Sequence, residues 1–254
     1  MSATSARTGW EWLKQGVGLF RKQPAALTTL LFANILISIA ISAVPLLGTV
    51  VAVVLMPSFS MAFMQACLTI EHGQRVTPAV WLTGFRKPAV IDLCKVGLVY
   101  LAITLVLRGL MHLLVGDDFW KQVTAPIDPK VGPTVDPSDL FGMLCIVVLE
   151  IAGLMALCFA APLTYWQKMG PGKAIFYSFF AVLGSVRAFL VLLLSWFGIF
   201  FGLCMMITLV FGGGSFGRVL IMWVIFLFIL LMQCSIYAGY RQIFGIPELP
   251  AKRP

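Results

Sequence analysis

Six uninterrupted apolar segments dominate the 254-residue chain. Their approximate limits are residues 25–44, 46–69, 89–115, 140–163, 188–211 and 219–240. Each reaches or exceeds the ~20 residues that a helix needs to cross the hydrocarbon core of a bilayer. None shows the alternation of apolar and polar residues that marks the strands of a membrane barrel. The sequence therefore predicts an all-α, polytopic membrane bundle of about six spans, in a single integral membrane domain over residues 1–254.

The composition excludes several other classes of protein. Hydrophobic residues make up 60% of the chain and charged residues only 11%, whereas a soluble domain carries roughly a quarter charged residues. So few charged side chains cannot cover so much apolar surface. A soluble enzyme, a disordered chain and a secreted disulfide scaffold are all excluded.

The loop charges predict an orientation. If the N-terminus is cytoplasmic, fourteen of the eighteen Lys and Arg residues fall on the cytoplasmic side and three on the opposite side. Basic residues gather in the cytoplasmic loops of membrane proteins, so both termini are expected inside. Residues 116–139 then form a periplasmic loop with five Asp residues. The net charge of +8 is polarised across a bilayer and indicates anionic lipid rather than nucleic acid as a partner.

Basic and aromatic residues also mark the starts of the spans. Residues 8–22 carry Trp10, Leu13, Val17 and Phe20 at helical spacing, which predicts an amphipathic helix in the headgroup region. Similar borders recur along the chain and indicate three units, at about 8–71, 76–170 and 172–246, each with an interfacial helix and a hairpin of two spans. The alternative is that such borders are common to bacterial membrane proteins. The candidate contacts to lipid headgroups are Lys14, Arg21, Lys22, Arg86, Lys87, Lys173 and Arg187.

Several short motifs at the helix borders carry a family resemblance. They are Phe20-Arg21-Lys22-Gln23-Pro24, the run 61–67 with Glu71-His72-Gly73, Ala161-Pro162 with the run 170–174, and the ending 236–245. Together they resemble an uncharacterised family of proteobacterial multi-pass inner-membrane proteins. They are more distantly similar to the membrane domain fused to some glycerophosphodiester phosphodiesterases. The resemblance implies a fold and an inner-membrane location, and it supplies no catalytic residues.

Two charged residues fall inside the predicted spans. Glu150 lies near the middle of the fourth span, and Arg108 lies at a similar depth in the third, with His112 one turn further along. An ionisable group in the membrane is a candidate functional site. Glu150 and Arg108 are expected either to form an ion pair that locks the two helices or to form a protonatable or substrate-binding site. In a third interpretation Arg108 extends to the interface and Glu150 is neutral.

A few further residues in the spans have two interpretations each. Asn34 and Gln65 are expected to hydrogen-bond between helices, and the alternative is that they line a cavity. Gly198 and Gly202 form a GxxxG pattern, which favours close helix packing inside the monomer over a dimer face.

The pattern of residues names no reaction. No catalytic motif is present, and neither a metal site nor a cofactor is indicated. We expect a non-enzymatic protein of the bacterial inner membrane that is linked to lipid or envelope homeostasis, with membrane lipids as its partners. The alternative is a small transporter or channel that uses the region around Glu150 and Arg108. A lipid-modifying enzyme is weakly supported because no nucleophile or metal constellation is visible.

Overall fold

The computed structural model describes residues 6–45, 47–115 and 137–247. Within these residues, six helices are long and apolar enough to cross a membrane. They are α2 (Pro24–Ser42), α3 (Leu47–Glu71), α4 (Ala89–Leu114), the joined α6 (Pro137–Cys158) and α7 (Ala160–Trp166), α9 (Val186–Phe211) and α10 (Ser215–Phe244). The predicted all-α membrane bundle is confirmed.

The predicted limits of the spans are close to the observed ones. The largest differences are at α10, which extends the predicted 219–240 at both ends, and at α6, which begins at Pro137 instead of residue 140. A proline is accommodated at the first position of a helix because its missing N–H would have no partner there. Most of the predicted periplasmic loop, residues 116–136, lies outside the described residues.

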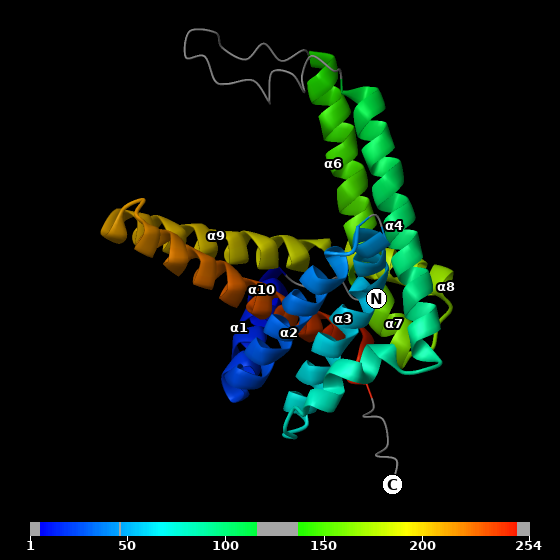
Figure 1. Ribbon diagram of the computed structural model, residues 1–254, viewed down its shortest axis with the longest axis horizontal. Helices are drawn as coiled ribbons and strands as arrows, with labels where there is room; N and C mark the ends of the chain where they lie inside the picture. The colour runs from blue at the N-terminus through cyan, green and yellow to red at the C-terminus, as the bar shows by residue number, and fades with distance from the viewer. Residues whose placement is uncertain (1–5, 46, 116–136, 248–254) are drawn as a thin grey trace.

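A short helix precedes each pair of long helices. The short helices are α1 (Ala6–Lys22), the 3₁₀ helix η1 (Pro78–Phe85) and α8 (Pro171–Gly184). Helices α2, α4 and α9 therefore begin at one end of the molecule, and helices α3, α7 and α10 end there. We call this the hub end, and the opposite one the far end. From the hub end, the α4/α6 and α9/α10 pairs run in different directions (Figure 1).

The protein core lies at the hub end. One buried cluster joins six helices through Leu19 of α1 and side chains such as Leu27, Leu68, Leu93, Ala161 and Tyr237. Burial inside the protein reaches 39% of the α3 span but only 6% of the α9 span. Lipid tails are as apolar as these side chains, so a helix that leaves the core can stay exposed within the bilayer.

Helix α1 is amphipathic as predicted, but much of its apolar face packs against protein instead of lipid headgroups. Trp12, Leu13 and Leu19 are buried, whereas Trp10 is 41% exposed. The buried face contacts α9 and α10, where the Trp12 and Phe189 ring centroids are 5.2 Å apart. Of the predicted stripe, Leu13 is buried against protein, whereas Trp10 stays exposed. The apolar face of α1 packs against protein, which leaves its basic residues exposed.

Glycines allow the closest helix contacts. A Cβ added at Gly9 of α1 would lie 2.0 Å from the carbonyl oxygen of Ala188, and one at Gly97 of α4 would lie 2.0 Å from that of Val54. The predicted packing of Gly198 and Gly202 inside the monomer is wrong. Both are exposed, and an added Cβ would meet nothing within 4 Å among the residues that the structure describes.

The junction of α6 and α7 follows from Pro162. Proline has no N–H, so it cannot donate to the carbonyl of Cys158 four residues earlier, and the helix is interrupted at Phe159. The N–H of Phe159 donates to Ser178 Oγ over 2.9 Å, and the Ser178 hydroxyl donates to the carbonyl of Met155 over 2.9 Å. One buried serine on α8 therefore satisfies the interrupted backbone and connects α8 to the hairpin.

Candidate functional site

The seven candidate headgroup contacts are all exposed at the hub end. Three are on α1, two lie directly before α4, one is in the first turn of α8 and one is in the first turn of α9: Lys14, Arg21, Lys22, Arg86, Lys87, Lys173 and Arg187. We call this set the basic surface. Its members come from all three predicted units. The far end of the described chain has Arg218 near the start of α10.

Exposed aromatic side chains accompany the basic surface. The ammonium of Lys14 lies 5.6 Å from the centre of the Trp10 ring, and that of Lys173 lies 5.7 Å from the Tyr177 ring. Phe176 and Tyr177 on α8 are 61% and 46% exposed. Aromatic rings concentrate at the membrane–water interface, where lysine stems lie along apolar surface and the ammonium stays in water. The arrangement fits the headgroup layer of a bilayer.

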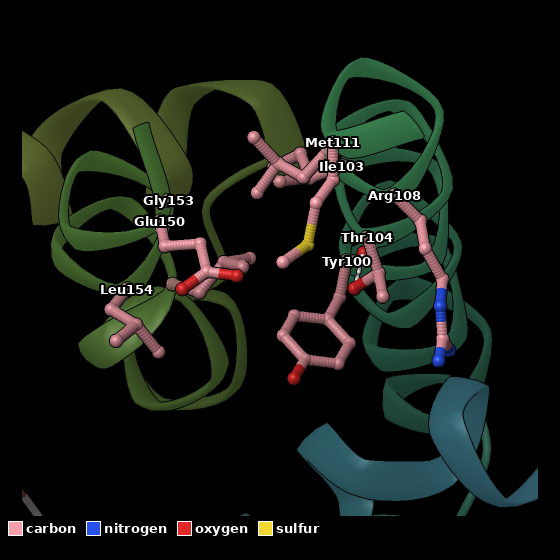
Figure 2. Close-up of a pocket in the computed structure, with 10 residues that line it drawn as sticks. Tyr100, Ile103, Thr104, Arg108, Met111, Glu150, Gly153 and Leu154 are labelled. Atoms are coloured by element: carbon pink, nitrogen blue, oxygen red, sulfur yellow. Dashed lines mark hydrogen bonds between the residues drawn. The ribbon is translucent and has the colours of Figure 1, made fainter. Parts of the chain in front are cut away.

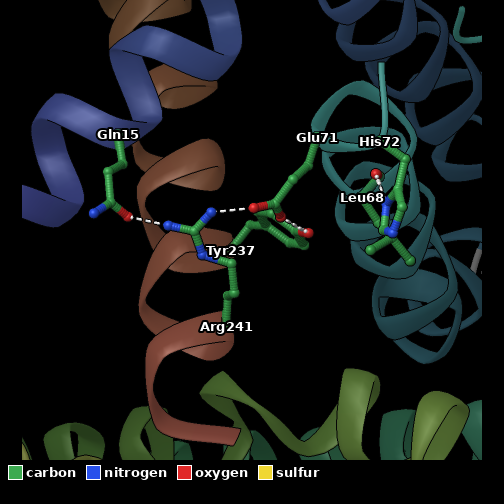
Figure 3. Close-up of polar contacts among 6 residues, drawn as sticks. All are labelled: Gln15, Leu68, Glu71, His72, Tyr237 and Arg241. Atoms are coloured by element: carbon green, nitrogen blue, oxygen red, sulfur yellow. Dashed lines mark hydrogen bonds and ion pairs between the residues drawn. The ribbon is translucent and has the colours of Figure 1, made fainter. Parts of the chain in front are cut away.

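A second polar site, which we call the hub, lies between three helices at this end. It consists of Gln15 on α1, Glu71 at the end of α3, and Tyr237 and Arg241 in the last two turns of α10. Arg241 forms an ion pair with Glu71 and donates a second hydrogen bond to Gln15 Oε1 over 2.6 Å. The Tyr237 hydroxyl donates to the other carboxylate oxygen of Glu71 over 2.5 Å (Figure 3).

The two charged side chains of the hub are paired with each other and hydrogen-bonded within it. The side chains of Glu71 and Arg241 are only 17% and 27% exposed, so each charge has lost most of its water. Both carboxylate oxygens accept hydrogen bonds, and the guanidinium donates to two different helices. His72, directly after α3, is not among these bonded residues, and its ring bonds to the carbonyl of Leu68 in the last turn of α3 over 2.9 Å. The hub therefore joins α1, α3 and α10.

Sequence reasoning missed the hub. In the sequence, Arg241 is one of the fourteen basic residues of the cytoplasmic side and Glu71 is part of a border motif, although both lie in the last turn of an apolar helix. The pattern that could have indicated the hub is an acidic residue, Glu71, and a basic residue, Arg241, in the last turns of two spans that end on the same side of the membrane. Which helix faces which could not be deduced from sequence.

Four further side-chain bonds connect the elements around the hub. Trp81 on η1 donates to Asn34 over 2.6 Å, and Trp166 donates to Gln65 over 3.2 Å. The amide of Gln23 donates to the carbonyl of Gln74 over 2.7 Å and accepts from the N–H of Val76 over 3.0 Å. The predicted interhelical bonds of Asn34 and Gln65 are confirmed.

The third site is a groove between α4 and α6, where Arg108 and Glu150 lie. Two close approaches define the register of this antiparallel pair: Gly142 contacts Leu114, and Gly153 contacts Ile103. Glu150 therefore lies opposite position 106, within one turn of Arg108. The predicted similarity in depth agrees with this register.

The predicted ion pair does not form. Within the part of the chain that the structure describes, neither Arg108 nor Glu150 belongs to an ion pair, and both are exposed. Figure 2 shows the ring of Tyr100 between the Glu150 carboxylate and the Arg108 guanidinium. The two side chains therefore line the groove and do not meet.

The groove has a volume of about 400 Å³, and its lining mixes polar and apolar side chains. Tyr100, Thr104 and Arg108 line it from α4, and Glu150 and Leu154 from α6. His112, the third predicted member, is exposed one turn beyond Arg108 and is not among the lining residues.

The chain is similar to one protein of Burkholderia thailandensis, named Probable inner membrane protein BTH_II0599. The two are 30% identical over 253 residues, which is 96% of this chain and 93% of the relative. The chain belongs to this inner-membrane protein family. No family model and no solved structure matches it.

Membership of the inner-membrane family agrees with the six apolar helices. The protein is a multi-pass protein of the inner membrane. The expected family of inner-membrane proteins is thereby confirmed, whereas the similarity to the membrane domain of glycerophosphodiester phosphodiesterases stays a prediction. The name of the relative gives no reaction and no transported substrate.

Proposed function

We propose that this protein is a non-enzymatic inner-membrane protein that binds anionic lipid headgroups through the basic surface, with both termini in the cytoplasm. The observation that carries the proposal is the gathering of seven exposed basic residues at one end of six apolar helices. A role in lipid or envelope homeostasis would follow from this binding.

Electrostatics support an anionic lipid as the partner. A basic residue near an anionic membrane surface contributes about 1 kcal/mol of attraction, which decays within a Debye length. At that size, one residue changes lipid affinity by about fivefold, because 1.4 kcal/mol corresponds to tenfold. Binding should weaken with added salt, since exposed charges are screened.

The proposed orientation follows from the same residues. Basic residues are retained on the cytoplasmic side during insertion, so the hub end, where α10 also ends, would face the cytoplasm. A green fluorescent protein fused to the C-terminus should therefore fluoresce, whereas alkaline phosphatase fused at the same position should be inactive. Active phosphatase with a dark fluorescent fusion would overturn this orientation.

A non-enzymatic role is supported by how the hub uses its groups. The carboxylate, the phenol and the guanidinium bond to one another and to Gln15, which leaves the carboxylate engaged by two donors. Such an arrangement stabilises a helix junction and positions no free nucleophile beside a base.

Native mass spectrometry of the purified full-length protein tests lipid binding. Phosphatidylglycerol should bind more tightly than phosphatidylcholine. The triple variant Lys22→Gln/Arg86→Gln/Lys87→Gln should lose most of that preference, and Arg218→Gln at the far end should keep it. Equal binding of the two lipids by the unaltered protein, or an unchanged preference in the triple variant, would overturn the proposal.

A further inference from the structure

Polar side chains run along one ridge of helix α4. Tyr100, Thr104 and Arg108 occur at every fourth position, and His112 follows at the same spacing. Residues four apart form a continuous ridge on a helix surface. Towards the hub end, the exposed Asp92 and Lys95 form an ion pair with a distance of 2.9 Å. Helix α4 therefore carries polar groups over most of its length.

The groove beside this ridge lies inside the hydrocarbon core. Helix α4 has 26 residues and is about 39 Å long, which exceeds the ~30 Å thickness of the core. Tyr100 lies near the middle of α4, and Arg108 lies about 12 Å closer to the far end. Glu150 is level with position 106 of α4. The groove therefore extends from the middle of the membrane toward the far end.

The two charges in the groove need a polar environment. A carboxylate or guanidinium in the middle of a membrane helix is unfavourable unless it is paired or faces a polar cavity. Arg108 and Glu150 form no ion pair within the described chain, and both line the same concavity. Its volume of about 400 Å³ falls within the range of small-molecule sites.

We propose that the α4–α6 groove, continued toward the hub end by Asp92 and Lys95 of α4, is a path by which phospholipid headgroups that carry both a phosphate and an ammonium cross between the two leaflets. Arg108 binds the phosphate, because a guanidinium matches phosphate oxygens with paired donors. Glu150 binds the ammonium on the other side of Tyr100. The proposal concerns a different surface from the basic surface and goes beyond headgroup binding there.

The surroundings of the groove favour a lipid over a second protein chain. The acyl chains of a bound lipid remain in the bilayer, against exposed apolar side chains such as Leu105, Leu144 and Leu154. These side chains need no protein cover in a membrane. The charges are set in a concavity of headgroup size rather than on a protruding face, so a small polar ligand reaches both of them.

Full-length protein in sealed vesicles of phosphatidylethanolamine and phosphatidylglycerol tests the proposal. A fluorescent phosphatidylethanolamine, labelled on an acyl chain so that its ammonium is retained, is extracted from the outer leaflet by albumin. Without protein, only the outer-leaflet pool should be extracted quickly. With protein, the inner-leaflet pool should follow, and an acyl-labelled phosphatidylglycerol, which lacks the ammonium, should follow more slowly.

Variants assign the effect to the groove. Arg108→Gln and Glu150→Gln should each slow extraction of the inner pool by at least about tenfold, because a bond to a charged group is worth roughly 1.5 kcal/mol or more. Leu154→Trp narrows the groove without changing a charge and should slow it as well. Arg218→Gln and Leu194→Trp are the matched controls and should leave the rate unchanged, because Leu194 is 71% exposed on α9 and does not line the groove.

The outcomes separate the alternatives. No exchange by the unaltered protein, or equal rates for all variants, would overturn the proposal. A change of oligomeric state in Arg108→Gln or Glu150→Gln, with the exchange rate unchanged, would mean that a second copy of the chain covers the groove and would also overturn it. Gel filtration of each variant shows that it is folded. Failure here leaves the basic surface untouched, since phosphatidylglycerol binding is measured separately.

Discussion

The hub and the α4–α6 groove each contain a carboxylate and a guanidinium from different helices, and they treat them differently. In the hub, Glu71 and Arg241 form an ion pair and both bond to further side chains. In the groove, Glu150 and Arg108 lie within one turn of each other in depth, with the Tyr100 ring between them (Figure 2). The first pair is enclosed by three helices, whereas the second lines a concavity.

The charges of the hub and those of the groove differ in whether they are available to a ligand. Charges that satisfy each other stabilise a junction, and removing one partner leaves the other buried and unpaired. Charges that face a cavity contribute little to folding and are available to a ligand. Similar residue types therefore serve structure at the hub end and, in our proposal, function in the middle of the membrane.

The largest expected difference in Tm is between substitutions of Arg241 in the hub and of Arg108 in the groove. Arg241→Met leaves the Glu71 carboxylate without its ion pair and should destabilise the protein by about 3 kcal/mol, or about 6–12 °C in Tm. Arg108→Met removes a guanidinium that has no ion pair in the described chain and should change Tm little. Thermal unfolding of both variants in the same detergent measures the difference. Equal losses would mean that the groove charges are structural too.

A smaller effect compares two glycines of α4. A methyl group at Gly97 would collide with the carbonyl oxygen of Val54, whereas one at Gly109 would meet nothing within 4 Å. Gly97→Ala should therefore cost about 1–3 kcal/mol through forced separation of α3 and α4. Gly109→Ala should be neutral or stabilising by up to about 1 kcal/mol, because alanine favours a helix. If both variants unfolded at the same temperature, α3 and α4 would not be packed as described.

The smallest effect compares two tryptophans. Trp81→Phe removes the donor to the buried Asn34 and should cost about 1–2 kcal/mol. Trp223, which is 56% exposed on α10, is the control, and Trp223→Phe should have no measurable effect on Tm. Asn34 lies inside a span, and the side-chain oxygen of Asn34 has a hydrogen-bond donor only because Trp81 of η1 packs beside it. A larger loss for Trp223→Phe than for Trp81→Phe would contradict it.

The spans and the polar crosslinks between them were predictable to different degrees. Apolar length alone located the six helices within a few residues, because a bilayer requires long apolar runs. The depth of Glu150 and Arg108 was also predictable from the rise of a helix and the order of the chain. Their failure to pair was not, because the direction of each side chain depends on how α4 and α6 are rotated about their axes.

Contacts between helices distant in sequence account for the rest. The bond from Arg241 to Gln15 joins residues 226 positions apart, and no local pattern indicates it. The packing of α1 against protein was not predictable for a similar reason. A stripe that begins at Trp10 is a good interfacial face, but α9 and α10 offer α1 a close-packed surface at Gly9 and Trp12, and protein packing determined the orientation.

The most direct test is the Tm of Glu71→Gln against that of Glu150→Gln in the same detergent. Both substitutions remove one negative charge and keep the shape of the side chain. Glu71→Gln should lose the ion pair with Arg241 and unfold at least about 4 °C lower than the unaltered protein. Glu150→Gln should stay within about 1 °C or rise, because a charge facing the hydrocarbon region is removed. A loss for Glu150→Gln equal to or larger than that for Glu71→Gln would contradict the distinction between the hub and the groove.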